Sequence, residues 1–431
     1  MKKFVSLFFH TPILIVLCLT FIVFGIPALA RESQINEFAV AVGVGIDKSE
    51  NENFEYGVSF LLFVPIPDQT FTENYKVLNA DGDSISDAVN QVGLYIGKKI
   101  RFAHIKTIVI GEDILNENII EMLDYFVREN DIASSTKIVS TNGKALDFLK
   151  VAEKIDSKMT TKISEIVSYN SDDLFGVESS LENLYNGYLS PTKTSLVATL
   201  KMKDDAGLSE IDGGKQGGLS GEENKQESKK IYNDGEAVVL KEGKKVAVMS
   251  GDLTKSLNLF LGKFDTGFLT VFDVPFEKET NLSFEIFGGN AKTKAYFEND
   301  VPVLELFLDV EVELVEMETK DNKLLQESKT VALSQKQKTF IQNAIKNDIK
   351  TLLEFESENK IDVTNLYCVF ENCDKTKFEK FLRTLDDKDS YIGNILVKTK
   401  VNLKFRWLSF LIFCSDCLFY FWKYARMFNI C

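Results

Sequence analysis

The sequence is poor in the side chains that most enzymes use for chemistry near neutral pH. Of its 431 residues only two are histidines, and His10 lies in an apolar N-terminal run, which leaves His104 alone in the rest of the chain. No P-loop, nucleophile elbow, H-E-x-x-H motif or EF-hand loop occurs, and Gly43-Val-Gly45 lacks the third glycine and the helix of a dinucleotide site. Acid–base and nucleophilic catalysis need such groups. The sequence therefore predicts a binding or structural protein with no catalytic, cofactor-binding or metal-binding residues.

His104 stands at the entry to a predicted strand. No cysteine or second histidine lies nearby to complete a metal or catalytic set. We expect a structural imidazole, buried and hydrogen-bonded, that ties the loop 101–103 to the strand. The competing hypothesis is a direct role in signalling or ligand contact.

Cysteine is too scarce for a disulfide framework in a chain of this size. Cys368 and Cys373 are either a small disulfide or two buried free thiols. A zinc site needs four ligands, and no histidine accompanies these cysteines. Cys414 and Cys417 have the spacing of a redox motif without its strand and helix, so we interpret them as apolar tail residues.

Positive charge is also in deficit. The net charge is −14, and because Lys2 and Lys3 precede the apolar run, the rest of the chain carries −16. This balance argues against a nucleic-acid partner, and against binding an anionic lipid surface through general electrostatics.

The N-terminus carries the longest apolar run. Lys2 and Lys3 are followed by uncharged residues from Phe4 to Ala30, ending in Ala28-Leu-Ala30. A basic start, an apolar stretch and an A-x-A ending are the parts of a secretory signal, but this stretch is also long enough to cross roughly 30 Å of hydrocarbon as a helix. Residues 1–30 are thus a signal sequence cleaved after Ala30 or a retained membrane anchor, and we favour the anchor on length. Either way, residues from 31 onward lie outside the cytoplasm.

Residues 31–200 are predicted to form one or more mixed α/β domains. Short apolar runs bounded by turns predict strands, and amphipathic stretches between them predict helices. The predicted strands are 38–46, 54–64, 105–110 and 136–140, and the predicted helices are 84–98, 113–128 and 144–153.

Residues 201–230 break this pattern with six glycines and few apolar side chains. Such a composition buries too little surface to offset its ordering entropy, so it predicts a flexible linker and a domain boundary.

Residues 231–406 are predicted to form a C-terminal α/β domain. It contains a hairpin at 236–249, a strand at 303–317, a helix from Ser334 to about residue 356 and a last strand at 395–405. The strand at 303–317 alternates with period two, and its polar side carries an acidic row: Glu305, Asp309, Glu311 and Glu313. This row is either a cation site or, as we favour, a solvated strand face.

Residues 407–431 are an atypical apolar tail. A second membrane-associated helix is one interpretation, but Asp416 in its middle is costly there. We favour a frame-shifted, non-functional end.

Three segments carry a resemblance to a known family. Residues 35–48, which include Phe38-Ala-Val-Ala-Val-Gly-Val-Gly-Ile-Asp47, resemble the opening of the Ger(x)C family, the C subunits of spore germinant receptors. Residues 97–113 are similar to its central motif, and residues 235–244 resemble the start of its C-terminal domain. The resemblance covers residues 32–406.

The resemblance implies a mixed α/β fold without catalytic residues, on the outer face of the spore inner membrane and beside two integral-membrane partners, the A and B subunits. Family members are typically lipoproteins, whereas Ala28-Leu-Ala30-Arg31 carries no cysteine here. Two other function classes remain open: a free-standing exported ligand-binding or cell-surface protein, and an extracytoplasmic hydrolase. The residues alone leave open whether the chain binds a germinant.

Overall fold

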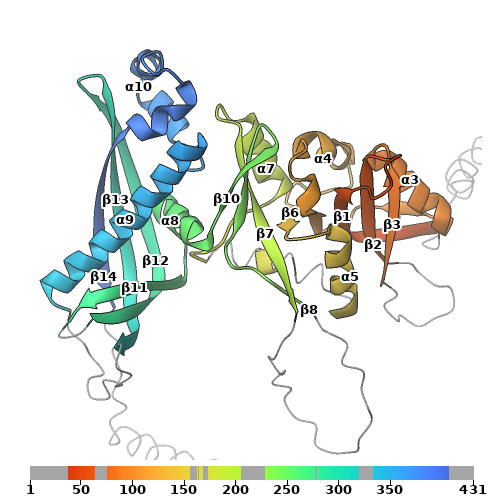
Figure 1. Cartoon of the computed structure of the whole chain (residues 1–431), viewed down its shortest axis with the longest axis horizontal. Coiled ribbons are helices and arrows are strands. Elements are labelled where there is room, and N and C mark those ends of the chain that lie inside the picture. Colours follow the sequence, from red (N-terminus) through yellow and green to blue (C-terminus); the bar gives the residue numbers. More distant parts are fainter. Residues whose placement is uncertain are drawn as a thin grey trace, which may run out of the picture.

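The computed structural model describes residues 37–63, 75–155, 163, 165–167, 173–204, 229–276, 279–319 and 333–406. The expectations for residues 1–30 and 407–431 fall outside these ranges. Two mixed β-sheets follow one another along the long axis of the molecule, and helices pack against both (Figure 1). The mixed α and β fold predicted from the sequence is confirmed.

The first sheet has ten strands in the described residues. Their order is β10-β9-β7-β6-β5-β1-β2-β3, with β4 beside β1 and β8 beside β7. The central strands β1, β5, β6 and β7 run parallel to one another, whereas β2 pairs antiparallel with β1 and β9 pairs antiparallel with β7. The strands are β1 Phe38–Lys48, β2 Tyr56–Phe63, β3 Tyr75–Gly82, β4 Lys99–Arg101, β5 Thr107–Ile110, β6 Lys137–Thr141, β7 Thr194–Asp204, β8 Lys229–Tyr232, β9 Ala237–Lys241 and β10 Lys244–Met249.

Helices cover both faces of this sheet, which explains why successive side chains of its central strands β5 and β6 are buried. One face packs against α3, α4 and α7, and the other packs against α5. These helices are α3 Ile85–Ile96, α4 Ile119–Arg128, α5 Ala145–Ile155 and α7 Leu181–Leu189.

The helix boundaries follow from capping residues. Ser84 caps α3 by accepting a hydrogen bond from the Asp87 backbone N–H, and Gly97 ends the helix in the left-handed conformation. The helix predicted from residue 113 begins only at Ile119, because Glu112–Ile114 forms a 3-10 turn and Asn118 caps α4.

The second sheet has the order β11-β12-β13-β14, antiparallel except for the parallel pair β13–β14. Helices α8, α9 and α10 cover its inner face. Ser334 and Gln337 form a capping box at the start of α9, where the sequence predicts a helix start. The elements are α8 Gly251–Leu261, β11 Gly267–Pro275, β12 Glu279–Glu298, β13 Val301–Thr319, α9 Gln335–Asn359, α10 Leu366–Leu382, the 3-10 helix η4 Lys388–Asn394 and β14 Leu396–Phe405.

The acidic row of β13 lies on the outer face of the second sheet. Glu305 stands opposite Lys294 of β12 and Lys398 of β14, and Glu311 accepts a hydrogen bond from Arg406 (2.6 Å). Basic side chains from neighbouring segments therefore lie beside these acidic residues. In the described part of the chain, no three His, Cys, Asp or Glu side chains gather to hold a metal ion.

The predicted linker 201–230 begins and ends in strand. β7 continues to Asp204 and β8 begins at Lys229, and these two strands pair from Lys201 opposite Tyr232 to Asp204 opposite Lys229. β9 and β10, which follow the linker, belong to the first sheet. Strands from both sides of the predicted boundary therefore pair with each other. The division into domains at 31–200 and 231–406 remains a proposal.

Among the helices that the structure describes, none is both long and apolar enough to span a membrane.

Limited trypsin digestion tests the pairing across the linker. We expect the first cuts within 201–230, after Lys215 or Lys225, because glycine-rich polar segments admit proteases readily. The two pieces should elute together from a sizing column and separate only in denaturant, because β7 pairs with β8 and β9. Separate elution without denaturant, or protection of this segment while cuts fall elsewhere, would contradict the expectation.

Candidate functional site

His104 does not have the predicted buried position. It lies in the turn between β4 and β5, and its side chain is exposed. The expectation of a buried, hydrogen-bonded imidazole is wrong, because the neighbouring Phe102 and Ile105 fill the core and leave His104 facing solvent. Cys368 and Cys373 both lie in α10 as free thiols; Cys368 is half-buried and Cys373 is exposed.

Two of the segments that carry the family resemblance meet at the carboxyl ends of β1 and β5. These strands pair in parallel, and the Gly111 backbone N–H donates to the Ile46 carbonyl (2.8 Å). The Asp47 carboxylate then accepts hydrogen bonds from the backbone N–H groups of Ala145 (2.7 Å) and Leu146 (2.9 Å) at the start of α5. A side chain at Gly111 would place its Cβ 2.0 Å from Asp47 Oδ1, so only glycine fits there.

Burial raises the pKa of the Asp47 carboxyl to about 6, against the lowering effect of its two backbone donors. The Asp47 carboxylate caps the start of α5 and so holds this helix against the paired strands β1 and β5. The strand predicted from the sequence ends at residue 46, and the role of Asp47 was missed; an acid directly after a nearly all-apolar strand was the available signal.

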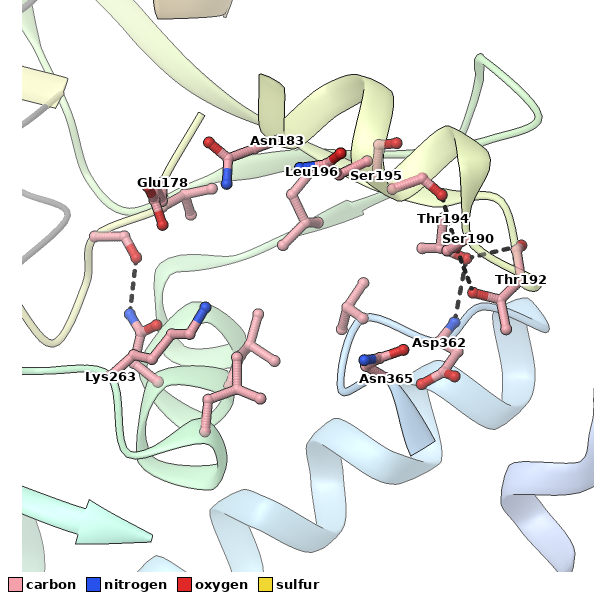
Figure 2. Close-up of a pocket in the computed structure, with 18 residues that line it drawn as sticks. Glu178, Asn183, Ser190, Thr192, Thr194, Ser195, Leu196, Lys263, Asp362 and Asn365 are labelled. Atoms are coloured by element: carbon pink, nitrogen blue, oxygen red, sulfur yellow. Dashed lines mark hydrogen bonds between the residues drawn. The ribbon is translucent and has the colours of Figure 1, made fainter. Parts of the chain in front are cut away.

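A cavity of about 320 Å³ opens where the two sheets adjoin. Its walls come from α7 and the loop before it, the first residues of β7, the end of α8 and the loop between α9 and α10 (Figure 2). Glu178, Asn183 and Lys263 lie towards one end, and Ser190, Thr192 and Asp362 lie towards the other. Apolar side chains also line the cavity: Val177, Leu196, Leu257, Leu261 and Val363.

Several polar groups of the cavity wall hold the wall itself together. The Asn258 side-chain amide donates to the carbonyls of Leu174 (2.9 Å) and Gly176 (2.8 Å), joining α8 to the loop before α7. Ser195 Oγ donates to the Leu184 carbonyl (2.8 Å). Glu178 and Lys263 are exposed at the rim. The lining of the cavity therefore mixes polar and apolar side chains, and the exposed Glu178 and Lys263 carry charges of opposite sign.

A buried polar cluster supports one side of this cavity. Glu356, near the end of α9, accepts hydrogen bonds from the backbone N–H groups of Val363 (2.7 Å) and Thr364 (2.8 Å). Asp362 accepts from the Leu366 N–H (2.8 Å) and from the Tyr391 hydroxyl (2.5 Å).

Burial raises the pKa of both carboxyls, and for Glu356 the neighbouring Asp362 adds to the rise. The Tyr391 hydroxyl opposes the rise at Asp362 and is itself held protonated, because burial and the Asp362 charge raise its pKa. The cluster fixes the turn between α9 and α10, and the Asp362 N–H donates to Thr194 Oγ1 at the start of β7 (3.4 Å). Glu356 and Asp362 lie in a polar stretch of the sequence, so no local pattern indicates that they are buried.

Replacing Tyr391 by Phe tests the cluster. The change removes one donor to a buried carboxylate, so we expect the free energy of unfolding to fall by about 1–3 kcal/mol. Because the lost hydrogen bond lowers the pKa of Asp362, its removal raises that pKa further, and the deficit should grow as pH rises from acid to neutral. Urea titrations at several pH values measure this, with Tyr95→Phe at an exposed tyrosine as the control. An equal deficit at every pH would show that Asp362 does not carry the charge.

Comparison with known proteins agrees with this architecture. Residues 31–202 match the spore germination protein N-terminal domain, and residues 234–406 match the spore germination B3/GerAC-like C-terminal domain. Spore germination protein B3 of Bacillus subtilis (strain 168) is 21% identical over 343 residues, which is 76% of this chain and 81% of that protein. Spore germination protein YndF of the same organism is 35% identical over 80 residues, covering 18% of this chain and 20% of that protein.

The same fold occurs in a solved structure. The crystal structure of the GerBC protein superposes with a TM-score of 0.51 and 17% sequence identity, covering 85% of this chain and 98% of that one. The two family domains follow each other in order and together account for most of the chain. The chain therefore belongs to the Ger(x)C family, the C subunits of spore germinant receptors.

Proposed function

We propose that this protein is a non-catalytic, extracytoplasmic subunit of a spore germinant receptor, needed for nutrient-triggered germination. It stands on the outer face of the spore inner membrane, beside the integral-membrane A and B subunits, and residues 4–30 hold it there. The observation that carries the proposal is the presence of both family domains, in order, in one chain with the GerBC fold.

The chemistry of the described residues supports a non-catalytic role. The two buried carboxyls at the α9–α10 turn are committed to backbone and hydroxyl donors within the protein. Asp47 is likewise occupied by the N-terminus of α5. These acids have the perturbed pKa values that often mark active sites, but their partners give each of them a structural task.

The cavity between the sheets favours a second candidate function, a free-standing exported protein that binds a small polar molecule. Its volume is that of a small-ligand site, and exposed Glu178 and Lys263 at its rim offer both signs of charge. This candidate requires cleavage after Ala30 and release from the membrane.

Fractionation of spores separates the two functions. A tagged chain should remain with the inner-membrane fraction and, after detergent extraction, co-purify with A and B subunits. The reciprocal experiment, with the tag on the A subunit, should recover this chain. Deleting the gene should abolish the response to nutrient germinants and leave spore yield and heat resistance unchanged, and the intact gene should restore the response.

A solitary protein in the soluble fraction, starting at Arg31, would overturn the receptor proposal and support the second candidate.

A further inference from the structure

The last turn of α3 presents two large apolar side chains to solvent. Leu94 is 74% exposed and Tyr95 is 82% exposed, while Ile85, Ala88 and Val92 bury the opposite side of the helix. A helix packed on a sheet normally turns polar residues outward at such positions. These two side chains therefore have no role in the core.

Basic residues follow directly. Lys99 is exposed, and the Arg101 guanidinium lies 4.5 Å from the centre of the Phe38 ring and 3.5 Å from the Asp131 carboxylate. Glu37 is an exposed acid at the same end of β1. Together with Lys98, the run 98–101 is a local excess of positive charge in a chain whose net charge is −14. We call Leu94, Tyr95, Lys99 and Arg101 the α3–β4 patch.

The patch lies beside the first described residues. β4 pairs in parallel with the start of β1, with Phe38 opposite Lys99 and Val40 opposite Arg101. Only seven residues, 31–37, separate Ala30, the end of the apolar run, from Phe38. The eight Cα-to-Cα steps from Ala30 to Phe38 span at most about 28 Å, so a membrane that holds residues 4–30 lies within that distance of Phe38, which stands opposite Lys99 of the patch.

We propose that the α3–β4 patch rests on the surface of an anionic lipid bilayer and sets the orientation of the protein on the membrane. Tyrosine and leucine suit the boundary between headgroups and acyl chains, and lysine and arginine beside them attract anionic headgroups. This inference rests on the proposed membrane location. The net negative charge of the chain argued against binding an anionic lipid surface. The proposal refines that expectation, because the surface that faces the lipid is a local basic cluster.

Tryptophan quenching in vesicles tests the contact. In the full chain, Trp407 and Trp422 are first replaced by Phe, and a single tryptophan is placed at Tyr95. The protein is reconstituted in vesicles of phosphatidylcholine and phosphatidylglycerol with brominated acyl chains. Since an interfacial residue reaches the acyl boundary, we expect Tyr95→Trp to lose about half of its fluorescence. The matched control is Leu189→Trp at the end of α7; Leu189 is 75% exposed against 82% for Tyr95, and α7 lies nearer the middle of the molecule in Figure 1 than α3 does.

The charge contribution is tested separately. Adding Lys99→Glu to Tyr95→Trp should restore most of the lost fluorescence in anionic vesicles and change little in pure phosphatidylcholine, while circular dichroism confirms an unchanged fold.

Two results would overturn the proposal. Equal quenching at both tryptophans would show contact without orientation. An unquenched Tyr95→Trp in vesicles that becomes shielded only when the A and B subunits are added would identify the patch as a protein contact. Neither result touches the receptor proposal, which depends on co-purification.

Discussion

The pairing of β9 with β7 is the constraint on which the rest of the structure depends. β9 comes after the predicted linker, yet it completes the first sheet in antiparallel register, from Thr194 opposite Lys241 to Ala198 opposite Ala237. Its alternating side chains enter different cores: Val238 and Leu240 join the core of the first sheet, and Ala237 and Val239 join that of the second. A single buried strand thus contributes side chains to both hydrophobic cores and joins them, because successive side chains of a strand point to opposite faces.

Further contacts reinforce this connection between the two cores. Lys241, the last residue of β9, donates to the Lys360 carbonyl (2.6 Å) and pairs with Asp389 (2.6 Å), linking the first sheet to the end of α9. The buried cluster of Glu356 and Asp362 then fixes the turn that follows. The cavity lies on this same junction, so anything that binds there contacts elements of both halves.

The sequence was informative wherever a pattern repeats over many residues or a cap has a distinctive residue. Period-two alternation located β13, and Ser334 marked the start of α9. It failed where one residue's surroundings decide its role. His104 is exposed because flanking Phe102 and Ile105 fill the core, which no local pattern reveals. The predicted domain boundary followed composition, and composition does not show that strands on either side of a polar segment pair with each other. Helix α10 was missed because its buried apolar residues lie on both sides of a kink at Asp374, which interrupts the helical period.

The claim that β9 joins the two hydrophobic cores is tested most directly by native-state hydrogen exchange on the Leu240→Ala variant. Leu240 faces only the first core, and its truncation should cost roughly 2–5 kcal/mol. If β9 joins the two cores into one cooperative unit, backbone amides of β5 in the first sheet and of β13 in the second should lose protection by similar amounts. Loss of protection in β5 alone, with β13 unchanged, would show that the two halves unfold independently and would contradict the claim that β9 joins the two cores.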